Sequence, residues 1–234
     1  MSSGLMVALD MDEGDEAVRL AGEIGSDVAA LKVGSQLFTR YGPDLVRQIT
    51  ESGGRVFLDL KYHDIPNTVA KAVRGAVEMG VSWFTVHASG GSDMIRAAKD
   101  AAGDARVLAV TVLTSLDRDA MGQVGWGGEV QDQVIRLANV AREAGADGIV
   151  CSALEVRSLR SALDDGCVLV TPGIRPAGAS TDDQARVATP ASAVADGADY
   201  LVVGRPIVKA HDRYEAVRLI LEEMKQGDVI RERD

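Results

Sequence analysis

The chain has 234 residues, a formal net charge of −10 and a hydrophobic fraction of 46%. This length fits one domain of barrel size as well as two small domains, and the apolar content is enough for a large core. The acidic surface disfavours nucleic acid and anionic membranes as partners, so an anionic ligand would need a locally positive pocket.

Apolar runs of strand length alternate with segments of helical periodicity along the whole chain. The predicted strands span residues 5–9, 28–33, 56–60, 83–86, 107–113, 148–151, 168–170 and 200–203. The predicted helices span residues 17–24, 37–49, 66–79, 94–102, 130–144, 154–163, 190–195 and 208–224. Residues 117–128 form a polar, glycine-bearing insert before the helix at 130–144, and we expect residues 174–185 to be a long polar loop and the tail 226–234 to be frayed.

Eight strands that alternate with eight helices in about this length are typical of the α/β class and of one closed parallel barrel, the (β/α)8 or TIM barrel. No linker, low-complexity segment or close internal repeat divides the sequence, so a single barrel domain over residues 1–234 is expected. A doubly wound open sheet is the alternative. The open sheet is disfavoured because no G-x-G-x-x-G motif opens the chain. The turn suited to binding a phosphate, at Gly204 and Arg205, follows the last strand instead of the first.

The N-terminus and the two cysteines indicate in which cellular compartment the protein is expected. The N-terminus carries no basic and apolar signal, and no apolar run approaches the length of a membrane span. Cys151 and Cys167 lie in or beside apolar strands, and we expect them to be reduced core residues rather than a disulfide pair. These features predict a soluble, cytoplasmic protein.

The third predicted strand ends in a charged stretch, RVFLDLKYHDIPNT, at residues 55–68. Asp59 and Lys61 point to the same face because a strand alternates its faces with period two. Opposite charges at the end of so apolar a strand are costly unless they pair with each other or meet a charged ligand. A structural ion pair is therefore the alternative to a functional site. Pro66 suits the first turn of the helix that follows.

Polar residues follow nearly every predicted strand. In a barrel the carboxyl ends of the strands meet at one mouth, where the site lies. The strand-end residues are Asp10, Lys32, Asp59, Lys61, His87, Thr114, Ser115, Ser152, Thr171, Gly204 and Arg205. The set predicts a polar site at this mouth.

The end of the eighth strand has the features of a phosphate site. In such barrels the loops after strands seven and eight commonly hold a phosphate. Gly204 has no side chain, so a ligand can come close to the backbone N–H groups there. Arg205 can bind two oxygens of the ligand at once. Arg175 adds a second cation and Gln184 a neutral donor, which favours a phosphorylated small molecule over a turn with a solvated arginine.

The histidines do not have the spacing of a metal site. His63, His87 and His211 are scattered, and no single loop carries enough oxygen ligands for calcium. Ser89 and Ser115, near His87, are the only candidates for a nucleophile. No metal is expected.

These motifs resemble those of the orotidine 5′-phosphate decarboxylase family, in its bacterial form. The stretch D-L-K-Y-H-D-I-P-N-T at residues 59–68 resembles the central signature of that family over its whole length. The segments V-T-V-L-T-S (110–115), V-T-P-G-I-R-P (170–176) and V-G-R-P (203–206) follow in the family's order. Asp10 and Lys32 complete the pattern, which extends to about Met224.

The resemblance implies a barrel of the ribulose-phosphate-binding type that acts as a homodimer, with active sites at the subunit interface. It implies loss of CO2 from orotidine 5′-monophosphate to give UMP, the last step of de novo pyrimidine biosynthesis, with no metal or organic cofactor. The implied catalytic residues are Lys61, Asp59, Asp64 and Lys32. Lys61 would protonate C6 of the pyrimidine, and Asp59 would lie beside the substrate carboxylate.

The resemblance also implies nine substrate-binding residues. They are Asp10, Lys32, Asp59, Thr68, Thr114, Arg175, Gln184, Gly204 and Arg205. The first two would bind ribose hydroxyls, Thr114 the pyrimidine and the last four the phosphate. Asp64 and Thr68 would reach into the site of the partner subunit.

Two other functions remain compatible with the motifs. Sister barrels with the same D-x-K-x-x-D core, such as a sugar-phosphate decarboxylase or hexulose-phosphate synthase, use Mg²⁺ but lack the I-P-N-T continuation. A nucleotide-binding barrel without catalysis is the second alternative. The intact set of Lys61 and two carboxylates disfavours it.

Overall fold

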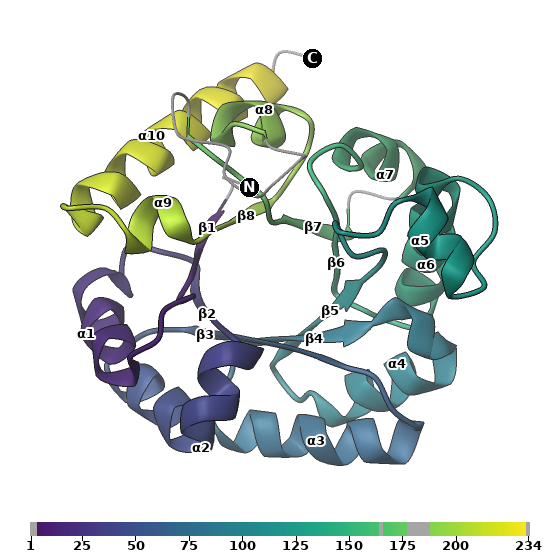
Figure 1. Ribbon diagram of the computed structural model, residues 1–234, viewed down its shortest axis with the longest axis horizontal. Helices are drawn as coiled ribbons and strands as arrows, with labels where there is room; N and C mark the ends of the chain where they lie inside the picture. Colours follow the sequence, from purple (N-terminus) through teal and green to yellow (C-terminus); the bar gives the residue numbers. More distant parts are fainter. Residues whose placement is uncertain (1–3, 164–165, 177–187, 233–234) are drawn as a thin grey trace.

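The computed structural model describes residues 4–163, 166–176 and 188–232. Within these ranges eight parallel strands pair in chain order, and β8 pairs with β1 to close a barrel (Figure 1). The strands are β1 (Gly4–Ala8), β2 (Ala30–Gly34), β3 (Val56–Tyr62), β4 (Trp83–His87), β5 (Arg106–Val110), β6 (Gly148–Val150), β7 (Val168–Thr171) and β8 (Tyr200–Val203). The predicted (β/α)8 barrel is confirmed.

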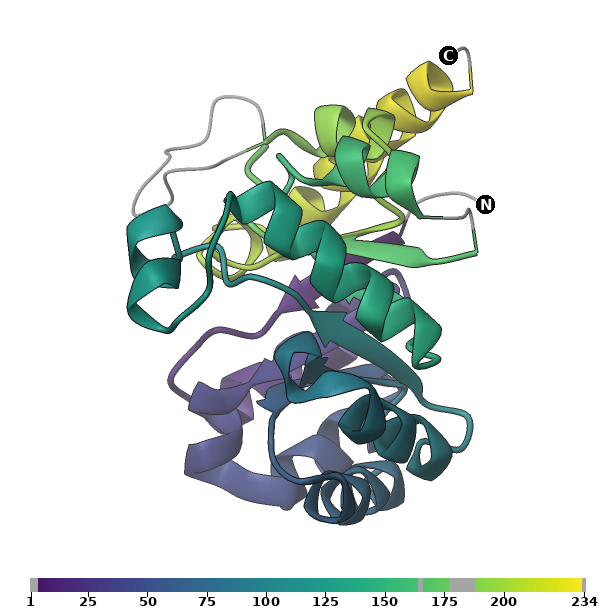
Figure 2. The ribbon, with the colours of Figure 1, turned by 90° about the vertical axis from the view of Figure 1, so that its right-hand side faces the viewer.

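The helices form a ring around the barrel, as Figures 1 and 2 show. They are α1 (Gly14–Ile24), α2 (Ser35–Glu51), α3 (Pro66–Glu78), α4 (Gly91–Ala101), α5 (Arg118–Gln123), α6 (Val130–Glu143), α7 (Val156–Ala162), α8 (Pro190–Ala195), α9 (Arg205–Val208) and α10 (Arg213–Arg231), with a short 3-10 helix at Ala88–Gly90. Pro66 stands in the first turn of α3, as predicted.

Strand alternation divides the core into two layers. Leu5 and Val7 of β1 belong to the large apolar layer that also contains helix residues such as Leu20, so this layer lies between sheet and helices. The smaller layer contains strand residues such as Met6 and Phe57 and fills the barrel interior. An inward-facing side chain therefore recurs at every second residue along each strand.

Two features of the local structure differ from the prediction. The polar insert 117–128 contains a helix that was not predicted, α5 at residues 118–123, whose N-terminus is capped by the Asp117 carboxylate accepting from the Ala120 N–H. The helix predicted at 208–224 begins only at Arg213, as α10, and the separate short helix α9 at Arg205–Val208 precedes it. Asp212 begins α10 by accepting from the Glu215 N–H, which breaks the helix at residues 209–212.

The predicted frayed tail from residue 226 is also wrong. Helix α10 continues to Arg231, and Met224 and Gly227 are buried on one face of it. Figure 2 shows α10 in yellow beside α8 in light green. The two helices pack closely at Gly227, where an added Cβ would lie only 2.5 Å from the Ala191 carbonyl oxygen and 2.7 Å from the Val194 Cβ.

Replacing Gly227 with alanine should lower the free energy of unfolding by about 1–3 kcal/mol, because the added methyl group overpacks the contact with α8. Urea unfolding measures the change. The control is Gly22→Ala in α1, where no neighbouring atom lies within 4 Å of an added Cβ. That change should raise stability by about 0.5–1 kcal/mol. An unchanged stability of Gly227→Ala would contradict the packing of α10 on α8.

Candidate active site

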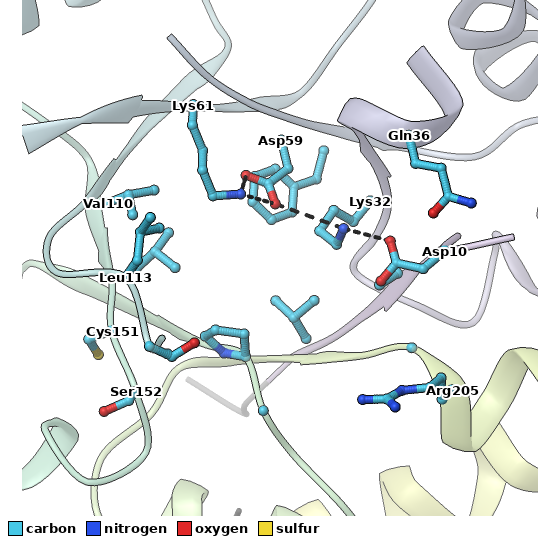
Figure 3. Close-up of a pocket in the computed structure, with 18 of the residues that line it drawn as sticks. Asp10, Lys32, Gln36, Asp59, Lys61, Val110, Leu113, Cys151, Ser152 and Arg205 are labelled. Atoms are coloured by element: carbon cyan, nitrogen blue, oxygen red, sulfur yellow. Dashed lines mark hydrogen bonds and ion pairs between the residues drawn. The ribbon is translucent and has the colours of Figure 1, made fainter. Parts of the chain in front are cut away.

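A pocket of about 650 Å³ opens at the carboxyl ends of the strands (Figure 3). Its volume suits a small-molecule ligand. The sequence-predicted residues that line it are Asp10, Lys32, Asp59, Lys61, Thr114, Ser152, Arg175, Gly204 and Arg205. The pocket therefore collects residues from seven of the eight strand ends, at the end of the barrel where this fold places its ligands.

The charged residues point inward because of the strand alternation described above. Ala30 and Phe57 fill the barrel interior. Lys32 and Asp59 follow them by two residues on β2 and β3, so they face the same interior one step nearer the mouth. The barrel is thus apolar at depth and charged at its mouth.

Four of these residues form a chain of alternating charge. The Lys61 Nζ lies 2.9 Å from each carboxylate oxygen of Asp59. The Lys32 Nζ lies 3.8 Å from Asp59 Oδ2 and 3.0 Å from Asp10 Oδ1. The side chains of Asp59 and Lys32 are only 14% and 12% exposed. Buried opposite charges at these distances fix one another's positions before any ligand binds.

The backbone at Lys61 is unusual. Its φ of 50° makes it the one non-glycine residue with positive φ in the described part of the chain. The ladder between β3 and β4 shifts register there, since Leu58 pairs with Phe84 but Tyr62 pairs with Val86. Residues held in this region of φ and ψ carry strain, which is often found at functional sites.

Thr85 of β4 holds this irregular segment, and the sequence analysis missed it. Its hydroxyl group accepts a hydrogen bond from the Lys61 N–H at 2.8 Å and donates one to Asp59 Oδ1 at 2.9 Å. Thr85 stands two residues before His87, so strand alternation starting from His87 would have placed it on the inward face. Gln36 and Lys209 line the pocket and were not among the predicted site residues.

The opposite side of the pocket carries cations. Arg205 lies across the cavity from Lys61 (Figure 3). Gly204 leaves no spare room, because a Cβ there would lie 3.3 Å from the Ala8 Cβ and 3.4 Å from Asp10 Oδ2. Arg175 is only 7% exposed and donates from Nη1 to the Ile174 carbonyl oxygen at 2.9 Å. Gln184, the fourth residue predicted for this end, lies outside the described residues.

A comparison with protein-family models identifies the family to which this chain belongs. A family model described as the orotidine 5′-phosphate decarboxylase / HUMPS family matches residues 3–220. The chain belongs to this family. The proposed resemblance is thereby confirmed.

Individual members of the orotidine 5′-phosphate decarboxylase / HUMPS family agree. The chain is 47% identical to the orotidine 5′-phosphate decarboxylase of Nitrosococcus oceani, over 93% of this chain and 96% of that one. It is 48% identical to that of Thermobifida fusca, over 97% of each. The crystal structure of the orotidine 5′-phosphate decarboxylase from Lactobacillus acidophilus superposes with a TM-score of 0.85 and 39% identity, over 95% of this chain and 99% of that one.

Asp64 and Thr68 of the family signature lie apart from the pocket of their own chain. Both are exposed and neither lines it. The Asp64 carboxylate accepts from the Ile65 N–H at 2.6 Å. The charge chain consequently ends at Asp10 on one side and Lys61 on the other.

The nucleophile and metal candidates can be judged within the family fold. Cys151 lines the pocket, but burial raises the pKa of its thiol far above the ordinary value, so it stays protonated. Cys151 and Cys167 are not joined by a disulfide.

Burial, and then repulsion by His63 and Lys61, lowers the pKa of His87. Among the described residues, no three His, Cys, Asp or Glu side chains are grouped to hold a metal, and no helix is long and apolar enough to cross a membrane.

Proposed function

We propose that this chain acts in the cytoplasm, where it converts orotidine 5′-monophosphate to UMP and CO2, the last step of UMP biosynthesis, without a metal or organic cofactor. The observation that carries the proposal is the Lys61 ammonium group, which faces the pocket and lies 2.9 Å from both carboxylate oxygens of Asp59. Support for the substrate comes from the names of the relatives, which are orotidine 5′-phosphate decarboxylases.

The chemistry requires a fixed positive charge. When the bond between C6 and the carboxylate carbon breaks, its electron pair stays on C6 in the ring plane, where the π system does not delocalise it. An ammonium group held beside C6 stabilises this charge, which is usually the largest catalytic contribution. One N–H bond of Lys61 then breaks as the C6–H bond forms. The neutral amine regains a proton from water.

The other members of the charge chain position Lys61 and bind the substrate. Asp59 would lie beside the substrate carboxylate and hold the Lys61 ammonium group at a fixed position. Lys32 orients Asp59 and, together with Asp10, would bind the ribose hydroxyls. Thr114, which lines the same pocket, would contact the pyrimidine.

The phosphate would bind at the cationic side of the pocket. Arg205 and Arg175 line it there, with Gly204 beside them, and Gln184 is the proposed fourth contact. This side is remote from Lys61, so its binding energy does not act on the reacting carbon directly. It can offset the cost of ordering loops and excluding water around the substrate.

Replacing Arg205 with alanine should weaken binding of UMP and raise KM by about 10- to 100-fold, because a hydrogen bond to a charged group contributes about 1.5–3 kcal/mol. The turnover number should change less than KM. Titration calorimetry with UMP and steady-state kinetics measure the two effects.

Two controls separate phosphate binding from general damage. Uridine lacks the phosphate, so its weak binding should not respond to Arg205→Ala. Arg157→Ala removes an exposed arginine of α7 that pairs with Asp196, and it should leave KM unchanged. Equal weakening of UMP and uridine binding by Arg205→Ala would contradict the assignment.

We further propose a homodimer in which Asp64 and Thr68 complete the site of the partner subunit. Two observations support it. Both residues are exposed and stand outside the pocket of their own chain, and Ile65 between them is an apolar side chain with 67% of its surface exposed. A solution mass that stays at one chain up to micromolar concentrations would rule out the dimer.

The deciding experiment mixes the purified chain with orotidine 5′-monophosphate and EDTA and follows ultraviolet absorbance. Conversion to UMP in the presence of EDTA is the expected result. Conversion that stops with EDTA and returns with Mg²⁺ would indicate the chemistry of the sister barrels. Binding without conversion would indicate a nucleotide-binding protein without catalysis.

A further inference from the structure

The β3–β4 ladder has a gap at the catalytic segment. Leu58 pairs with Phe84 and Tyr62 with Val86. Residues 59–61 of β3 therefore stand opposite Thr85 alone, and a regular ladder cannot satisfy their backbone groups. An unpaired N–H group in this partly buried place would be costly.

The Thr85 side chain takes the place of the missing ladder bond. Thr85 is fully buried, and its hydroxyl accepts from the Lys61 N–H at 2.8 Å. The single hydroxyl proton is donated to Asp59 Oδ1 at 2.9 Å. A threonine hydroxyl has one proton and two lone pairs, so this geometry uses its donor and leaves it one further acceptor site.

Both bonds act on the atoms that the proposed reaction needs. The first holds the backbone of Lys61 at its positive φ, a conformation that an L-residue adopts only when its surroundings impose it. The second fixes the rotation of the Asp59 carboxylate, whose oxygens in turn hold the Lys61 Nζ. The Thr85 hydroxyl group thus holds the Lys61 backbone N–H directly and the Lys61 Nζ indirectly, through the Asp59 carboxylate.

We propose that Thr85 is a positioning residue for the decarboxylation, which orients Asp59 and Lys61 without touching the substrate. This inference rests on the proposed function. A purely structural threonine would contribute to stability alone, whereas a positioning threonine contributes to the rate after the substrate has bound. A small misplacement of a reacting group is enough to lower that rate.

The test compares Thr85→Val with a matched change at Thr111, assaying kcat and KM with orotidine 5′-monophosphate, UMP affinity and Tm. Valine keeps the shape of threonine but has no hydroxyl. Thr111 is also buried, but its hydroxyl donates to the Val150 carbonyl oxygen at 3.3 Å instead of to the charge chain. Thr85→Val should lower kcat about 10- to 100-fold, the range for lost bonds to a charged group, with KM and UMP affinity within about threefold. Thr111→Val should leave kcat close to that of the wild type.

A second pair of variants distinguishes loss of the hydroxyl group from damage to the fold. Thr85→Ser and Thr85→Ala both lose the methyl group, and only the serine keeps the hydroxyl. Thr85→Ser should therefore recover most of the kcat that Thr85→Ala loses. The inference fails if Thr85→Val turns over like the wild type, if Thr111→Val loses kcat equally, or if serine and alanine at residue 85 are equally impaired. A wild-type chain without turnover overturns the proposed function and this inference together, whereas those three results overturn the inference alone.

Discussion

Lys61→Ala should lose at least about 10⁴-fold in turnover of orotidine 5′-monophosphate, because a positioned proton donor contributes about 10²–10⁴-fold and a positioned charge about 10²–10³-fold. Binding of UMP should stay within about tenfold, since UMP carries no developing charge at C6. Single-turnover kinetics and calorimetry with UMP measure the two quantities. The combination of lost chemistry and kept binding is what distinguishes a group that acts on the transition state.

Lys99→Ala is the matched control for Lys61→Ala. Lys99 of α4 also lies between the two oxygens of a carboxylate, at 2.6 and 2.7 Å from those of Asp147. Asp147 precedes β6, so this ion pair lies at the amino ends of the strands, away from the pocket. Conserved turnover in Lys99→Ala is expected. A Lys61→Ala protein that matches the wild-type rate would refute the assigned role of Lys61.

The second large effect concerns Asp59. Asp59→Asn keeps the size of the side chain but removes the charge that lies between Lys61 and Lys32. The two ammonium groups then repel each other across a neutral amide, and the Lys61 Nζ loses the partner that fixes it. We expect turnover to fall about 10²–10³-fold, the range seen when a positioned electrostatic group is removed.

Asp147→Asn provides the comparison for Asp59→Asn. Asp147 pairs with Lys99 and accepts from the Val107 N–H at 2.8 Å, so its replacement should lower Tm. It should leave kcat near the wild-type value, because stability resides at the amino end of a barrel and catalysis at the carboxyl end. If both asparagine variants lost turnover to the same extent, the fall at Asp59 would reflect general destabilisation.

The positions of the charges at the mouth were predictable from local pattern. A strand has period two, so D-x-K after an apolar run puts both charges on one face. Parallel strands of a barrel have their carboxyl ends at one mouth, so Asp10, Lys32 and Arg205 could be grouped before any coordinates. The pocket lining agrees with this grouping.

The error at the tail lies where a distant segment decides the conformation. The tail after residue 226 has no strong helical pattern of its own, and it is ordered because α8 packs on Gly227. The late start of α10 has a local cause, the Asp212 cap, whereas the order of the tail depends on packing between two helices. Local propensity is a weak guide when tertiary contacts of this kind contribute more free energy.

The sequence by itself determined the barrel, the family and the set of charged residues at the mouth, because these depend on periodicity, on strand order and on residue type. Only the tertiary structure decided which of those residues touch. The 3.8 Å between Lys32 and Asp59 depends on how β2 pairs with β3, and the contacts of Thr85 depend on the shifted register between β3 and β4. The apolar pattern sets which face each strand buries, but the shift that leaves three residues of β3 opposite Thr85 alone is a relation between segments 26 residues apart, as between Asp59 and Thr85.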